Sequence, residues 1–121
     1  MGTQAARILI VEDEPMLAMD LEFMLRELGC EIVGVASRID SATRMAREVQ
    51  CDGAVLDLNL DGSSANSVAD VLSERGIPFI FATGYGDQNL ALRFKHIPVV
   101  EKPYNHETIH SALKTVLAPD M

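Results

Sequence analysis

The chain has 121 residues, of which 48% are hydrophobic and 23% charged, and its net charge is -8. This length suits one domain spanning residues 1–121, and the apolar patterning places its core at about residues 7–117. The excess of acidic residues argues against nucleic acid as a direct ligand, because phosphate backbones are bound by clustered Lys and Arg. We therefore expect protein partners.

The cysteines and the amino-terminal residues indicate the cellular location of the protein. Cys30 and Cys51 are two isolated cysteines, without the spacing of a zinc site or the density of a disulfide scaffold. Residues 1–6 lack the basic start and apolar stretch of a signal peptide, and no apolar run has the length of a membrane span. The sequence predicts a soluble, cytoplasmic protein without a membrane partner.

Five apolar segments have the character of buried strands. They are short, rich in Val, Ile, Leu and Phe, and separated by helical patterns, which is typical of parallel strands covered on both faces. The expected strands are Ile8–Val11, Glu31–Ala36, Ala54–Leu56, Phe79–Ala82 and Pro98–Val100.

Five helices are expected between and after these strands. Pro15 suits the first turn of a helix that Gly29 ends, and Ser37 with Asp40 resembles a capping box that opens the second helix. Apolar residues from 65 to 72 form one face of a third helix, which Gly76 ends. A short, weaker helix covers Leu90, Phe94 and Ile97, and Asn105 caps the last, which buries Ile109, Ala112, Leu113 and Val116.

Alternating strands and helices predict an α/β fold. Because parallel crossovers are right-handed, five strand and helix pairs favour a flavodoxin-like, doubly wound sheet with strand order 2-1-3-4-5. In such sheets the ligand site lies beyond the carboxyl ends of the strands, and strands one and three are adjacent.

Polar residues follow four of the strands at this edge. Glu12 and Asp13 follow the first, Asp57 the third, Thr83 the fourth, and Lys102 lies just after the fifth. Two carboxylates about 5 Å apart repel by roughly 3 kcal/mol at an effective dielectric constant near 20, so a cation is needed among the three.

All-oxygen ligation by a few acidic groups suits Mg²⁺, which is often completed by phosphate oxygens. A carboxylate such as Asp57 can act as a nucleophile toward phosphorus once the phosphoryl charge is neutralised. Lys102 offers a fixed positive charge and Thr83 a hydroxyl. The set predicts phosphoryl transfer to Asp57.

These residues, in this order and setting, resemble the receiver domain of two-component response regulators over about residues 7–117. The resemblance implies that Asp57 is the phosphoacceptor, that a sensor histidine kinase or a phosphotransfer protein is the donor, and that the reaction depends on Mg²⁺. It also implies that Glu12, Asp13 and Asp57 hold the metal together with the backbone carbonyl of Asn59.

The same resemblance implies catalytic roles for Thr83 and Lys102, and a cis peptide bond before Pro103. The segment 77–86, IPFIFATGYG, is similar to a subgroup marked by FATGY and often found as single domains. The chain either acts alone or belongs to a longer regulator, and its downstream partner is not indicated.

The chain departs from the receiver pattern at the usual switch position. Val99 stands where the family commonly has an aromatic ring, three residues before the lysine. We therefore expect phosphorylation to draw Thr83 toward the phosphoryl group and to reorient Tyr85, which lies between two glycines. The partner-binding surface that responds would include the segment after Tyr85, the fifth strand and the last helix.

Three alternatives use the same residues. Asp57, Asn59, Asp61 and Gly62 begin like an EF-hand calcium loop, but position twelve is Val68 instead of Glu. A haloacid dehalogenase-like phosphatase also uses an aspartate nucleophile with Mg²⁺, but it places an acid/base Asp where this chain has Asn59. A degenerate receiver that acts only as a binding module would lack part of the set, which here is complete.

Overall fold

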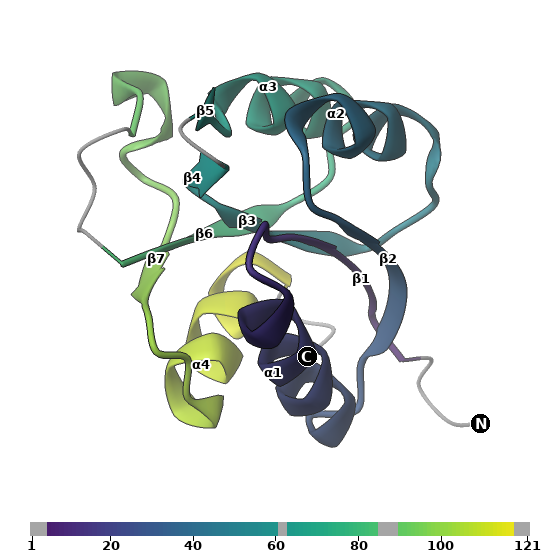
Figure 1. Ribbon diagram of the computed structural model, residues 1–121, viewed down its shortest axis with the longest axis vertical. Helices are drawn as coiled ribbons and strands as arrows, with labels where there is room; N and C mark the ends of the chain where they lie inside the picture. The colour runs from purple at the N-terminus through teal and green to yellow at the C-terminus, as the bar shows by residue number, and fades with distance from the viewer. Residues whose placement is uncertain (1–4, 61–62, 85–89, 118–121) are drawn as a thin grey trace.

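The protein is a three-layer α/β structure, and the computed structural model describes residues 5–60, 63–84 and 90–117 (Figure 1). Its main sheet has five parallel strands in the order β2-β1-β3-β6-β7. These are β1 (Arg7–Val11), β2 (Glu31–Ala36), β3 (Gly53–Asp57), β6 (Phe79–Thr83) and β7 (Val99–Glu101). The predicted fold and strand order are confirmed.

Helices cover both faces of this sheet. Figure 1 shows α2 (Ile39–Glu48) and α3 (Asn66–Glu74) on one face, and α1 (Pro15–Glu27) and α4 (His106–Leu117) on the other. A short antiparallel pair, β4 (Asn59–Leu60) and β5 (Ser63–Ser64), follows β3. None of the helices in the described part of the chain is long and apolar enough to cross a membrane.

Alternation along each strand divides the core into two clusters. In β1, Leu9 and Val11 pack with the α2 and α3 layer, whereas Ile8 and Ile10 pack with the α1 and α4 layer. All four side chains are buried, because a parallel sheet with helices on both faces has no solvent-facing side. This double burial explains the continuous apolar runs in the sequence.

Two glycines end helices as predicted. Gly29 and Gly76 have φ of 90° and 71°, the left-handed region that favours glycine. Beyond them, the N–H of Cys30 bonds to the carbonyl of Leu25 at 2.9 Å, and that of Ile77 bonds to Leu72 at 2.9 Å. These bonds satisfy the last carbonyls of α1 and α3 in Schellman motifs.

The predicted capping box at Ser37 and Asp40 is wrong. Helix α2 begins at Ile39, so Arg38 holds the N-cap position and forms no side-chain cap. Asp40 lies in the first turn, where its carboxylate accepts from the N–H of Ser41 at 2.8 Å and interacts favourably with the helix dipole. The predicted cap of α4 does form, since Asn105 Oδ1 accepts from the N–H of Thr108 at 2.9 Å.

The weak helix expected between β6 and β7 is only the 3₁₀ turn η1 (Leu92–Phe94). Its apolar spacing has another cause: Phe94 packs edge-on against Phe79 and Phe81, with ring centroids 5.7 and 5.9 Å away. Arg93 also forms a two-pronged ion pair with Asp70 of α3, at 2.8 and 2.9 Å. Tertiary contacts therefore hold this segment without a regular helix, and four α-helices are observed among the described residues.

Candidate functional site

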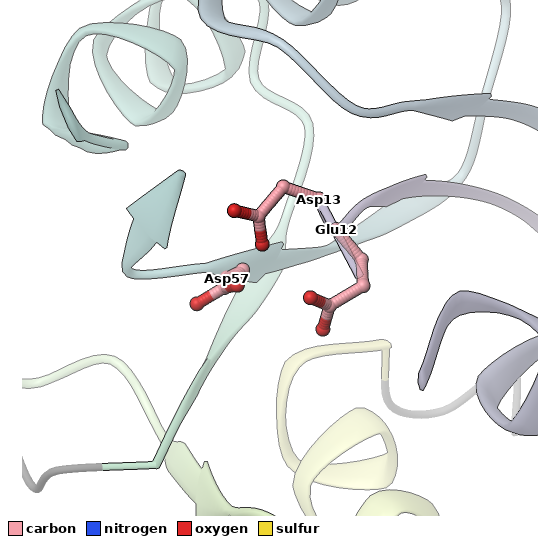
Figure 2. A group of neighbouring side chains, drawn as sticks. All are labelled: Glu12, Asp13 and Asp57. Atoms are coloured by element: carbon pink, nitrogen blue, oxygen red, sulfur yellow. The ribbon is translucent and has the colours of Figure 1, made fainter. Parts of the chain in front are cut away.

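Three carboxylates meet at the carboxyl edge of the sheet. Strands β1 and β3 pair in register up to Val11 and Leu56, so Glu12, Asp13 and Asp57 emerge side by side. One carboxylate oxygen from each lies within 4.8 Å of the other two. Figure 2 shows Asp13 extending toward Asp57, whereas the Glu12 carboxylate points away from Asp13. The predicted acidic cluster therefore forms, although its members face different directions.

Lys102 joins two of these carboxylates. Its Nζ lies 2.9 Å from Asp57 Oδ2 and 3.1 Å from Glu12 Oε1. The lysine side chain is 15% exposed, so both ion pairs are largely shielded from water. The peptide bond that follows, between Lys102 and Pro103, is cis.

Burial makes Asp57 an unusual carboxyl group. Only 4% of the residue is exposed, and desolvation raises its pKa from 3.8 to about 7. This value is the net result, since the nearby charge of Glu12 also raises the pKa, whereas hydrogen bonds from Lys102 and from the N–H of Asn59 lower it. For Lys102, burial opposes the charged form, but Asp57 and Glu12 outweigh it and the lysine pKa is raised.

Thr83 ends β6 next to this cluster. Asp57 pairs in register with Ala82, which places Thr83 one residue beyond it at the same edge. Thr83 is 4% exposed, and its carbonyl accepts from the N–H of Lys102 at 2.9 Å. The strands thus bring Asp57, Thr83 and Lys102 together, as predicted from their positions.

The other predicted residues lie around this centre. Asn59 is half-buried in β4, and its N–H donates to Asp57 Oδ1 at 3.1 Å. Val99 pairs in register with Phe81 and packs against the core of the α2 and α3 layer. The predicted switch residue Tyr85 lies outside the described residues.

Tyr104, which no sequence motif singled out, belongs to the same centre. Its hydroxyl donates to Glu12 Oε1 at 2.6 Å, and the residue is 7% exposed. Burial and the neighbouring carboxylates raise the pKa of this phenol well above its ordinary value, so it remains protonated. A tyrosine two positions after the lysine was the available signal, since a buried phenol needs a hydrogen-bond partner.

The donor set fits Mg²⁺. Its atoms are all carboxylate oxygens, and Asp13 is partly exposed, which leaves space for the waters that Mg²⁺ retains. An EF-hand is excluded because the residues before Asp57 form strand β3 instead of an entering helix.

Comparison with known proteins identifies the class. A model of the response regulator receiver domain matches residues 8–114. The chain therefore belongs to the response regulator receiver family, which is a signalling family and not a family of enzymes, and neither the fold nor the match favours a phosphatase.

Individual relatives agree with this assignment. The chain is 36% identical over 117 residues to the phyllosphere-induced regulator PhyR of Methylorubrum extorquens, covering 93% of this chain and 44% of PhyR. It is 30% identical to the transcriptional regulatory protein PdtaR of Mycobacterium tuberculosis, covering 93% of this chain and 57% of PdtaR. The chain thus spans about half the length of these curated relatives.

A solved structure matches over its whole length. The solution structure of SdrG from Sphingomonas melonis Fr1 superposes with a TM-score of 0.84 at 39% identity, covering 98% of this chain and 100% of SdrG as solved. The fold of this chain is therefore similar to that of SdrG over the whole length of the solved SdrG structure.

Proposed function

We propose that Asp57 accepts a phosphoryl group from a sensor histidine kinase or a phosphotransfer protein, and that the modified domain changes its affinity for a protein partner. The observation that carries this proposal is the buried Asp57 carboxylate, 2.9 Å from Lys102 and beside two further carboxylates. No nucleic acid is expected as a ligand, given the net charge of -8.

The transfer uses the residues at this edge directly. A carboxylate oxygen of Asp57 attacks phosphorus, the bond between phosphorus and the donor imidazole nitrogen breaks, and its electron pair leaves with the imidazole. Lys102 and the Thr83 hydroxyl then stabilise the negative phosphoryl oxygens. Mg²⁺ would neutralise charge on the incoming group.

Asp13, Asp57 and the carbonyl of Asn59 are the proposed direct ligands of Mg²⁺, with Glu12 acting through a water. Two observations support this division. Asp13 extends toward Asp57 (Figure 2), whereas both Glu12 oxygens already accept hydrogen bonds from the protein. Mg²⁺ also dehydrates reluctantly, which favours retained waters.

The proposed switch begins at Thr83. Attraction of its hydroxyl to a phosphoryl oxygen would move the chain after β6, including Tyr85, and charge-assisted hydrogen bonds of this kind can shift such an equilibrium. Val99 is aliphatic and packs against the core, so it offers no ring to change rotamer. Replacing Tyr85 with Ala should weaken the dependence of partner binding on phosphorylation.

Self-phosphorylation by a small donor and slow self-dephosphorylation are the only reactions we propose for this cytoplasmic domain. A degenerate receiver would lack a reactive residue, but here Asp13, Asp57, Thr83 and Lys102 all occupy the expected strand ends.

Intact-protein mass spectrometry after incubation with acetyl phosphate and Mg²⁺ tests the proposal. The wild type and the control Asp52→Ala, altered at the opposite end of β3, should gain one phosphoryl group, whereas Asp57→Ala should not. A full gain in Asp57→Ala would refute the assignment, and sustained turnover of a small phosphomonoester would favour the phosphatase alternative.

A further inference from the structure

Tyr104 connects the α1 and α4 layer to the phosphorylation site. Its ring packs in the core cluster of that layer, together with Ile10, Leu21 and Ile109. From there the hydroxyl reaches Glu12, 92 positions earlier in the chain, at 2.6 Å. This distance is typical of an O–H group that donates to an ionised carboxylate.

Glu12 itself is fully enclosed by protein. Its side chain has 0% exposure, so its hydrogen bonds must come from neighbouring groups. Oε1 accepts from Tyr104 and lies 3.1 Å from Lys102 Nζ. Oε2 accepts from the N–H of Glu14 at 3.1 Å and from Lys102 at 3.3 Å.

Glu12 and Asp57 both contact the Lys102 ammonium group. Lys102 Nζ lies closer to Asp57, at 2.9 Å, than to either oxygen of Glu12. Because Tyr104 and the Glu14 N–H satisfy part of the Glu12 charge, this carboxylate attracts the ammonium group less strongly than a bare one would. Loss of the phenol would remove the 2.6 Å hydrogen bond to Oε1 and leave this oxygen facing the Lys102 ammonium group at 3.1 Å.

We propose that Tyr104 is a positioning residue: by its hydrogen bond to Glu12 it directs Lys102 toward Asp57 and toward the phosphoryl group that Asp57 receives. The inference rests on the proposed function of Asp57. In this role Tyr104 contacts neither the phosphoryl group nor the metal, and it acts only through Glu12 and Lys102.

Tyr104→Phe is the test, because it removes one oxygen and keeps the ring that fills the core. Thr43→Val is the matched control, since it deletes a hydroxyl that bonds within α2, to the Ile39 carbonyl at 2.7 Å. The rate of phosphorylation by acetyl phosphate at saturating Mg²⁺ should fall about tenfold in Tyr104→Phe, as expected for loss of one charge-assisted hydrogen bond, and stay unchanged in Thr43→Val.

A double-mutant cycle separates positioning from a general structural effect. In a Lys102→Met background, Tyr104→Phe should change the residual rate by less than about twofold, because the group it positions is already absent. An equal loss in both backgrounds would overturn the proposal, as would a Tyr104→Phe rate equal to that of the wild type. If the wild type itself gains no phosphoryl group, the proposed function fails instead.

A measurement without metal or phosphate examines the positioning itself. The ¹H–¹⁵N NMR signal of the Lys102 ammonium group, assigned by its loss in Lys102→Met, should shift in Tyr104→Phe and not in Thr43→Val. An unchanged ammonium signal would contradict the inference even if the rate fell.

Discussion

Asp57 should make the free protein less stable as the pH rises, and Asp57→Asn tests this directly. The folded-state pKa of about 7 lies above the ordinary value of 3.8, mainly because the carboxyl group is buried. The folded protein therefore holds this proton more tightly than the unfolded chain. The stability that the protonated form provides is present below about pH 4 and is lost as the pH rises to about 7.

The size of the effect follows from the same values. One pKa unit corresponds to about 1.4 kcal/mol, so the interval between 3.8 and about 7 limits the loss to about 4 kcal/mol. Asn imitates the protonated acid at every pH. Asp57→Asn should therefore be more stable than the wild type by about 1–2 kcal/mol near pH 5 and by up to about 4 kcal/mol near pH 8.

Urea unfolding in the presence of a chelator, at both pH values, measures this difference. Asp52→Asn is the matched control, because it makes the same substitution at a residue whose side chain is 46% exposed. Adding Mg²⁺ should reduce this difference in the free energy of unfolding near pH 8, because the proposed metal site would bind Mg²⁺ in the folded wild type and stabilise it. The reasoning would be refuted if the difference in the free energy of unfolding between Asp57→Asn and the wild type stayed constant or decreased from pH 5 to pH 8.

Three further predictions concern the metal, the switch and the packing of α2 against α3. Calorimetric titration should show that Asp13→Asn weakens Mg²⁺ binding more than Glu12→Gln does, and equal effects would contradict a direct role for Asp13. NMR shift changes on adding a phosphate mimic should concentrate at residues 83–97 and diminish in Thr83→Ala; changes confined to the acidic residues would reject this switch. Arg75→Met should lower the free energy of unfolding by about 1–2 kcal/mol in urea titrations, because Arg75 Nη1 donates to two carbonyls at the end of α2, at 2.6 and 2.9 Å, and unchanged stability would exclude that role.

Features that depend on neighbouring residues in the chain were predictable from the sequence. Apolar runs identified the five strands, and Gly29 and Gly76 marked helix ends because only glycine adopts a positive φ there without strain. The right-handed crossover rule then predicted the strand order, and with it the edge where Asp57 and Lys102 meet. The resemblance to the receiver family could also be recognised, because the residues that carry it come directly after predicted strands in the sequence.

The tertiary structure alone decided how these side chains are held. The segment around Phe94 has helical spacing, but contacts with other aromatic rings and the Arg93–Asp70 ion pair hold it as a 3₁₀ turn. Glu12 accepts a hydrogen bond from Tyr104, which lies 92 positions later in the chain, so no local pattern around Glu12 indicates this partner. Local patterns specify which residues arrive at the edge of the sheet, whereas the competition among buried donors for each oxygen is settled by three-dimensional packing.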